Sequence, residues 1–174
     1  LYVNGLYSVL PGWLGSGSGG NPLLDAGTEL AVAVGLWLPT KNRLDGTINL
    51  PASGGGWTWT DVRNANYFLE NANRVPDGGL KDHYTGEAYF FRAWNYFTLL
   101  KQFGDLPIVT KPLSTDNKEV LYGPRSSRTD VANFIISDLD LAVGKLKKKA
   151  EVPAQRISRD IANLFLARVA LYEG

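Results

Sequence analysis

Several residue types that carry common kinds of chemistry are missing or scarce in this sequence. Its 174 residues include no cysteine and a single histidine, His83. Without thiols there is no disulfide, no cysteine nucleophile and no thiolate metal ligand. One histidine does not make a two-histidine metal site, so we expect no bound metal. We interpret His83, with Asp82 beside it, as a surface residue just before the start of a helix.

Charge and hydrophobicity exclude further classes of partner. Lysine and arginine number 18 against 17 acidic residues, which gives a formal net charge of +1. This balance favours neither nucleic acid nor an anionic membrane surface as the partner. No apolar run reaches the length of about 18 residues that a membrane-spanning helix needs. Methionine is also missing, so we expect the chain to be part of a longer, processed one.

Glycine, serine and proline gather near the N-terminus. After a helical segment over residues 1–10, we predict a long, loop-rich insertion over residues 11–57. Residues 15–20 match the Gly-x-Gly-x-x-Gly pattern, but a dinucleotide site also needs a preceding strand and a following helix. Proline and glycine precede the stretch instead, and the downstream pattern is helical. We therefore interpret it as a flexible loop and expect no cofactor.

Four helical patterns follow the insertion. Each places apolar residues at helical spacing and ends at turn-forming residues. The predicted helices lie within residues 61–75, 81–103, 127–146 and 158–174, with an extended segment over residues 104–126. The sequence thus predicts a mainly α fold of paired antiparallel helices, similar to tetratricopeptide repeats, with its helical core over residues 58–174.

Polar residues and glycine mark the ends of these helices. Ser127, with Asp130 three residues later, forms a capping-box pattern, and Ser158 is the expected cap of the last helix. Gly104 follows the second helix, where the chain needs a residue in the left-handed conformation. We expect the Asp105 carboxylate to bond the amides of the same turn.

The predicted helix over residues 81–103 is unusually aromatic. From Gly86 to Val109 the sequence reads GEAYFFRAWNYFTLLKQFGDLPIV. Apolar residues cover well over half of the helix circumference, which favours an inner helix covered on two sides. We interpret these rings as core packing. Glu87 and Arg92 are interpreted as structural groups that hydrogen-bond neighbouring helices or the following turn.

The same run resembles the signature of SusD/RagB-type outer-membrane nutrient-binding proteins, in which a Glu-Ala…Arg-Ala…Tyr-Phe helix leads into Phe-Gly-Asp-x-Pro. Upstream, WTDVRNANYFLEN is similar to the Ala-Asn helix of that family. Downstream, DVANFIISDLDLAV and RISRDIANLFLARVALYEG resemble its next two helices. The resemblance extends from about Trp59 to Gly174, and its motifs occur in the family's order.

The resemblance implies a function as well as a fold. It implies a non-enzymatic protein on the extracellular face of a Gram-negative outer membrane, held by a lipid anchor that lies outside this chain. Such a protein binds oligosaccharides or peptides and works with a SusC-like TonB-dependent transporter. We expect residues 1–174 to be the N-terminal helical-repeat domain of a glycan-binding member.

Three alternatives stay open at this point. The first is a relative that captures peptides, since the same helices would serve either cargo. The second is a structural helical-repeat scaffold without a ligand. The third is a glycan hydrolase, which needs two carboxylates at a set separation in a cleft. The acidic residues show no such pairing in the sequence, and we expect no catalytic residues.

Tryptophans in the loop-rich insertion are the candidate ligand contacts. Trp37 and Trp57 lie in or beside loops rather than on a core stripe. The C–H face of a sugar packs on an exposed aromatic ring, while amide and guanidinium groups bond its hydroxyls. Asn42 and Arg43 follow Trp37 and supply those groups. We therefore predict a ligand site made of Trp37, Asn42, Arg43 and Trp57.

Overall fold

A computed structural model describes residues 2–10, 46–47, 52, 54 and 56–174. The chain divides into two units. The first, which we call the helical unit, contains residues 1–7 and 58–174, and the second contains residues 8–57. Almost all of the described structure belongs to the helical unit.

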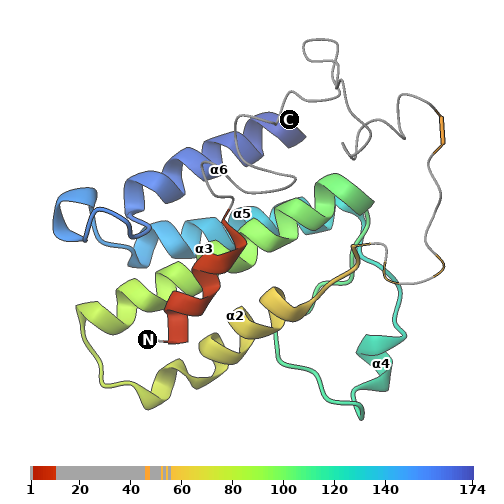
Figure 1. The fold of residues 1–174 in the computed structure, drawn as a ribbon, viewed down its shortest axis with the longest axis horizontal. Coiled ribbons are helices and arrows are strands. Elements are labelled where there is room, and N and C mark those ends of the chain that lie inside the picture. Colours follow the sequence, from red (N-terminus) through yellow and green to blue (C-terminus); the bar gives the residue numbers. More distant parts are fainter. Residues whose placement is uncertain (1, 11–45, 48–51, 53, 55) are drawn as a thin grey trace. The chain divides into compact units, whose positions relative to one another are not determined.

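The described residues are mainly helical, as predicted (Figure 1). The α-helices are α2 (Thr60–Asn71), α3 (Gly79–Phe103), α4 (Lys118–Leu121), α5 (Arg128–Lys145) and α6 (Arg159–Glu173). The 3₁₀ helices are η1 (Tyr2–Val9), η3 (Ala72–Arg74) and η4 (Lys149–Glu151). Within the described part of the chain, extended pairing is limited to one antiparallel bridge between Leu106 and Ser126.

The four long helices form two successive antiparallel hairpins (Figure 1). Helix α2 pairs with α3, and α5 pairs with α6. The most extensive contact joins the two hairpins, between α3 and α5. Helix α3 is therefore covered on two sides, which is the position that its wide apolar arc predicted.

The core is centred on the aromatic rings of α3. Phe91 and Tyr96 are fully buried. The rings of Phe90 and Phe97 each lie 5.5 Å from the ring of Phe165 on α6. Helix α5 contributes a stripe of fully buried residues, namely Val131, Ile135, Leu139, Ala142 and Leu146. The interpretation of the α3 rings as core packing is confirmed.

Two of the predicted helix ends are confirmed in atomic detail. The Ser127 side chain accepts the N–H of Asp130 at the start of α5 and donates to its carboxylate at 2.6 Å. Gly104 follows α3 with φ of +72°, and its N–H bonds to the carbonyl oxygen of Leu100. A left-handed glycine thus ends the longest helix.

Two other helix ends differ from the expectation in their side-chain bonds, although Ser158 is the N-cap residue of α6 as predicted. Asp105 does not cap its own turn, because its carboxylate accepts the N–H of Arg128 at 2.8 Å, in the first turn of α5. The positive end of a helix is a favourable place for that negative charge. Ser158 precedes α6 but makes no side-chain capping bond. Its hydroxyl is buried and has no hydrogen-bond partner among the described residues.

The predictions for His83 and for the short helix α4 also differ from the structure. Helix α3 begins at Gly79, and His83 lies inside the helix rather than just before its start. The residue is only 3% exposed. The prediction of a surface histidine is wrong, because the chain at Lys147 packs over this turn of α3. Helix α4 occupies part of the segment predicted to be extended, and none of its residues is buried.

A glycine marks the close approach of the two hairpins. A Cβ atom added to Gly86 on α3 would lie 2.9 Å from Cγ of Leu146 and 3.2 Å from the carbonyl oxygen of Ala142. Contacts this short, two of the three nearest being to backbone atoms, leave no room for a side chain. Gly144 on α5 offers a contrast, because no atom lies within 4 Å of its added Cβ.

We expect Gly86→Ala to lower the free energy of unfolding by about 1–2 kcal/mol, because α5 must shift away from α3. The matched control, Gly144→Ala, should be neutral or should raise that free energy by up to about 1 kcal/mol through helix propensity. Urea denaturation of both variants measures the difference. Equal changes in the two variants would contradict the tight crossing at Gly86.

Candidate functional site

The ligand site predicted from the sequence falls mostly outside the described residues. Trp37, Asn42 and Arg43 all lie outside them, and Trp57 is described. The Trp57 N–H bonds to the carbonyl oxygen of Gly54 at 2.8 Å, which closes a tight turn before α2. The site of Trp37, Asn42, Arg43 and Trp57 therefore stays a prediction.

One buried polar cluster, the Arg92 cluster, joins three helices. Arg92 on α3 donates from Nε and Nη2 to the two carboxylate oxygens of Asp138 on α5, both at 2.7 Å. Its Nη1 donates to Oδ1 of Asn66 on α2 at 2.8 Å. Asn66 in turn donates to the carbonyl oxygen of Val109 at 2.8 Å. The guanidinium therefore links α2, α3 and α5 and the segment after α3.

Burial affects the ionisation of this cluster. It raises the pKa of Asp138, and the hydrogen bonds and charge of Arg92 oppose that shift. Burial likewise raises the pKa of Tyr96 to about 12. The Tyr96 hydroxyl accepts the N–H of Val109 at 2.7 Å. These groups are enclosed and satisfied by one another, so the structural role expected for Arg92 is confirmed.

A second buried cluster, the Glu87 cluster, holds η1 and the chain before α6 against α3. Glu87 is fully buried. Its carboxylate accepts the Tyr7 hydroxyl at 2.5 Å and Arg156 Nε at 2.9 Å, and it also bonds Nη2 of Arg156. The Tyr7 hydroxyl accepts the N–H of Ile157 at 3.0 Å, and Arg156 Nη1 donates to Asn4 at 2.7 Å.

His83 lies at the edge of the Glu87 cluster. Its Nδ1 accepts the N–H of Lys147 at 3.3 Å. Its Nε2 is 3.2 Å from Oε1 of Glu87, in an orientation that makes no hydrogen bond. Burial lowers the pKa of His83 most; the charges of Arg156 and Lys147 lower it further, against the opposing effect of Glu87.

The two clusters bear on the hydrolase alternative. Both buried carboxylates, Glu87 and Asp138, are neutralised by arginine and enclosed by helices. A catalytic pair of carboxylates must instead face the glycosidic bond in a cleft. Across the described residues, moreover, no group of three or more potential ligands could hold a metal ion. These two buried carboxylates therefore give no support to hydrolysis.

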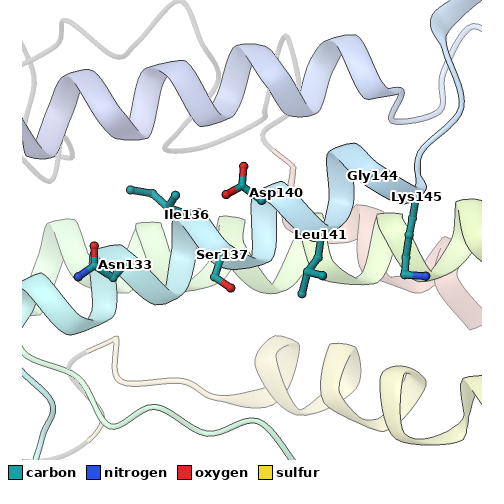
Figure 2. A pocket seen from close by; sticks show the side chains of 7 residues that line it. All are labelled: Asn133, Ile136, Ser137, Asp140, Leu141, Gly144 and Lys145. Atoms are coloured by element: carbon teal, nitrogen blue, oxygen red, sulfur yellow. The ribbon is translucent and has the colours of Figure 1, made fainter.

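An open hollow of about 600 Å³ runs along the outer face of α5 (Figure 2). Seven residues of this one helix line it, namely Asn133, Ile136, Ser137, Asp140, Leu141, Gly144 and Lys145. Its amide, hydroxyl, carboxylate and ammonium groups suit hydrogen bonding to a polar ligand. None of these lining residues carries a ring, so the described part of the hollow lacks a stacking surface for a sugar ring.

A second hollow, of about 420 Å³, lies where α3 begins and α5 ends. Lys145, Lys147 and Arg159 contribute positive charge to it, while Asp82 and Glu151 contribute negative charge. Lys145 lies 3.4 Å from Asp82, so part of this charge is already paired. The mixture gives no clear preference for an anionic or a cationic ligand.

Removing one charged partner of the Arg92 cluster should lower the stability of the fold. We expect Asp138→Ala to lower the free energy of unfolding by about 3–5 kcal/mol, because it leaves a buried, unpaired guanidinium. The double variant Arg92→Met with Asp138→Leu should recover much of that loss, because it removes both charges. Urea denaturation measures both. Additive losses in a cycle of single and double variants would contradict the pairing.

Acid should destabilise the fold through His83. In the unfolded chain a histidine has a pKa of about 6.5. The pKa of His83 in the folded chain is lower, so the unfolded chain takes up the proton more readily. The contribution of His83 to the free energy of unfolding is therefore fully present above about pH 6.5. It is lost as the pH decreases through the folded pKa. His83 is the only histidine, so His83→Asn should flatten the stability profile between about pH 5 and 7. An unchanged slope would contradict this.

The helical unit matches one protein family. The family model described as "Starch-binding associating with outer membrane", of the SusD-like group, matches residues 57–171. SusD-like protein P2 of Formosa agariphila is 30% identical over 119 residues, which is 65% of this chain and 22% of that protein. The chain spans only 15% to 22% of the length of the curated relatives it matches.

Solved structures of similar proteins confirm the fold. A SusD-like protein from Bacteroides fragilis is 25% identical, with a TM-score of 0.69 over 99% of this chain and 34% of that one. A laminarin binding SusD-like protein is 25% identical, with a TM-score of 0.65 over 77% of this chain and 30% of that one. The tetratricopeptide-like arrangement is thus confirmed, and the chain belongs to the SusD-like family.

Proposed function

We propose that this chain belongs to a cell-surface protein that binds oligosaccharides without cleaving them. The observation that carries the proposal is the match of residues 57–171 to a family described by starch binding at the outer membrane. The likeness to a laminarin binding protein, at 25% identity, supports a glycan as the ligand.

The geometry of the helical unit supports a division between scaffold and ligand contacts. Its buried charges bond one another, in the Arg92 and Glu87 clusters, and are closed to a ligand. Ligand contacts are therefore left to loops and outward helix faces, which suits surface recognition of a polymer. The predicted loop site of Trp37, Asn42, Arg43 and Trp57 remains part of the proposal.

We also propose the location and partner that the family implies. The protein is held at the extracellular face of the outer membrane by a lipid anchor outside this chain, and it delivers its ligand to a SusC-like TonB-dependent transporter. The family description supports association with the outer membrane. Across the described residues, no helix is long and apolar enough to cross a membrane.

A glycan array tests the ligand class directly. The array should contain starch, laminarin and xyloglucan oligosaccharides, with product analysis on every well that binds. Binding without new reducing ends supports the proposal, whereas turnover would favour the hydrolase. Binding to peptides alone would favour a peptide-capturing relative. Silence toward glycans and peptides would favour a scaffold and would overturn the proposal.

Affinity purification from native outer membranes in mild detergent tests the proposed partner. A TonB-dependent transporter should be recovered at near-stoichiometric amount. The transporter should also be recovered after the glycan is removed, because we propose that the two proteins form a stable complex. A preparation that never contains such a transporter would contradict the partnership and leave glycan binding intact.

Replacing the loop tryptophans should separate binding from folding. We expect Trp37→Ala or Trp57→Ala to weaken glycan binding about tenfold or more, because a stacking ring is a typical binding hot spot. The melting temperature should change little, because loop residues contribute few core contacts. Calorimetric titration and thermal melts measure the two effects.

Trp94 provides the control for that experiment. Its ring on α3 lies 4.9 Å from the ring of Phe165, so it is a packing residue. Trp94→Ala should lower the free energy of unfolding by about 3 kcal/mol and leave the affinity of the folded fraction unchanged. If both loop variants keep full affinity, the ligand site lies elsewhere. If their melting temperatures fall as that of Trp94→Ala does, the loop rings are packing residues.

A further inference from the structure

A partly exposed group of aromatic rings lies where η1 meets α2. Tyr2 of η1 and Tyr67 of α2 are 46% and 48% exposed, and their ring centroids are 5.6 Å apart. The Tyr2 ring also lies 6.3 Å from that of Phe68, with the two planes only 17° from parallel. We call these three rings the Tyr67 platform. It offers adjoining apolar surfaces to solvent, outside the core described above.

The rings of the platform are held in place by the fold. The Tyr2 hydroxyl donates to the carbonyl oxygen of Asn64 at 3.3 Å. Val3 and Leu6 of η1 are buried, and the Tyr7 hydroxyl bonds the Glu87 carboxylate at 2.5 Å. These contacts hold η1 against α2 and α3. Little conformational entropy is therefore lost when a ligand binds to the Tyr2 ring.

Carboxamide side chains flank the rings on the same helix. Asn64, Tyr67, Phe68 and Asn71 stand at positions i, i+3, i+4 and i+7, which share one face of α2. The Asn71 side chain donates to the carbonyl oxygen of Tyr67 at 2.8 Å. A carboxamide both donates and accepts hydrogen bonds, so it can bond a hydroxyl in either sense. On this face the two rings therefore lie between two carboxamide groups.

The charge of the surroundings favours a neutral ligand. The charge of Arg63 acts on Tyr2, and Nη1 of Arg63 donates to the carbonyl oxygen of Leu113 at 2.6 Å. Arg63 and Glu70 stand four residues before and three residues after Tyr67 on α2, and both are exposed. Their charges are opposite, so this face has no net charge. The combination of rings and amides matches a sugar ring, which presents C–H groups on a face and hydroxyls around its rim.

We propose that the Tyr67 platform is a subsite for a neutral sugar unit of the bound oligosaccharide. The sugar face packs on Tyr67 and Tyr2, and Asn64 and Asn71 bond its hydroxyls. The inference rests on the proposed function, but it uses residues of the helical unit rather than the tryptophans of the insertion. It therefore succeeds or fails independently of the predicted loop site.

Single substitutions at Tyr67 test the subsite. The probes are laminarin, malto- and xyloglucan oligosaccharides, each titrated by calorimetry against the whole chain. For whichever probe the wild-type chain binds, Tyr67→Ala should weaken affinity about tenfold. Tyr67→Phe keeps the ring and should stay within about threefold of wild type. Asn71→Ala should give a loss between these two.

Tyr122 provides the matched control. It is 85% exposed and adjoins α4, and it makes no ring contact among the described residues. Tyr122→Ala should leave the affinity within about twofold of wild type, because a lone exposed ring provides no prepared surface. Thermal melts accompany every titration. The Tyr67 and Tyr122 variants should melt within a few degrees of each other.

The outcomes separate the subsite from the proposed function. If the wild-type chain binds a probe and Tyr67→Ala binds it equally well, the subsite is overturned and glycan binding stands. If Tyr67→Ala melts well below Tyr122→Ala, the ring is a packing element and the subsite is again overturned. Equal losses from both alanine variants would also overturn it. If the wild-type chain binds none of the three probes, both the subsite and the proposed glycan binding are overturned.

Discussion

The arrangement of this molecule depends on burying two charged side chains on one aromatic helix. Glu87 and Arg92 stand on α3 among rings that need cover on two sides, and a buried charge without a partner costs several kcal/mol. Each charge therefore requires a particular partner from elsewhere in the chain. Arg92 finds Asp138, and Glu87 finds Arg156. Satisfying both fixes the positions of α5 and of the chain before α6 relative to α3.

This constraint explains why the most recognisable part of the sequence says little about the ligand. The residues that carry the family resemblance, among them Glu87, Arg92 and Gly104, are occupied with helix contacts and a helix end. They specify the scaffold, and the same scaffold serves proteins that bind different cargoes. In our proposal, specificity comes from side chains that the scaffold holds outward, such as Tyr67. Tyr67 lies within WTDVRNANYFLEN, the stretch similar to the family's Ala-Asn helix, but the resemblance assigns it no contact with a ligand.

Local signals predicted the helices well, and distant contacts account for the errors. Ser127 and Gly104 act on their own helix ends, so their roles were predictable from neighbouring residues. The partners of His83 and Asp105 are Lys147 and Arg128, which local patterns do not identify. The candidate site follows the same division. The Tyr67 platform was not foreseen, because it depends on Tyr2 lying beside α2. The predicted tryptophan site stays a prediction.

The chemistry of the exposed surfaces decides which of them suits a glycan. The outer side of α6 exposes Leu164 and Leu171, at 73% and 86%, and aliphatic side chains of this kind offer no bond to a hydroxyl. The hollow along α5 combines the aliphatic side chains of Ile136 and Leu141 with polar groups, and none of its described lining residues carries a ring. A sugar needs both kinds of contact at once, since its faces are apolar and its rim is polar. Among these three helix faces, only that of α2 carries rings bracketed by amides, and its rings are held in place before any ligand arrives.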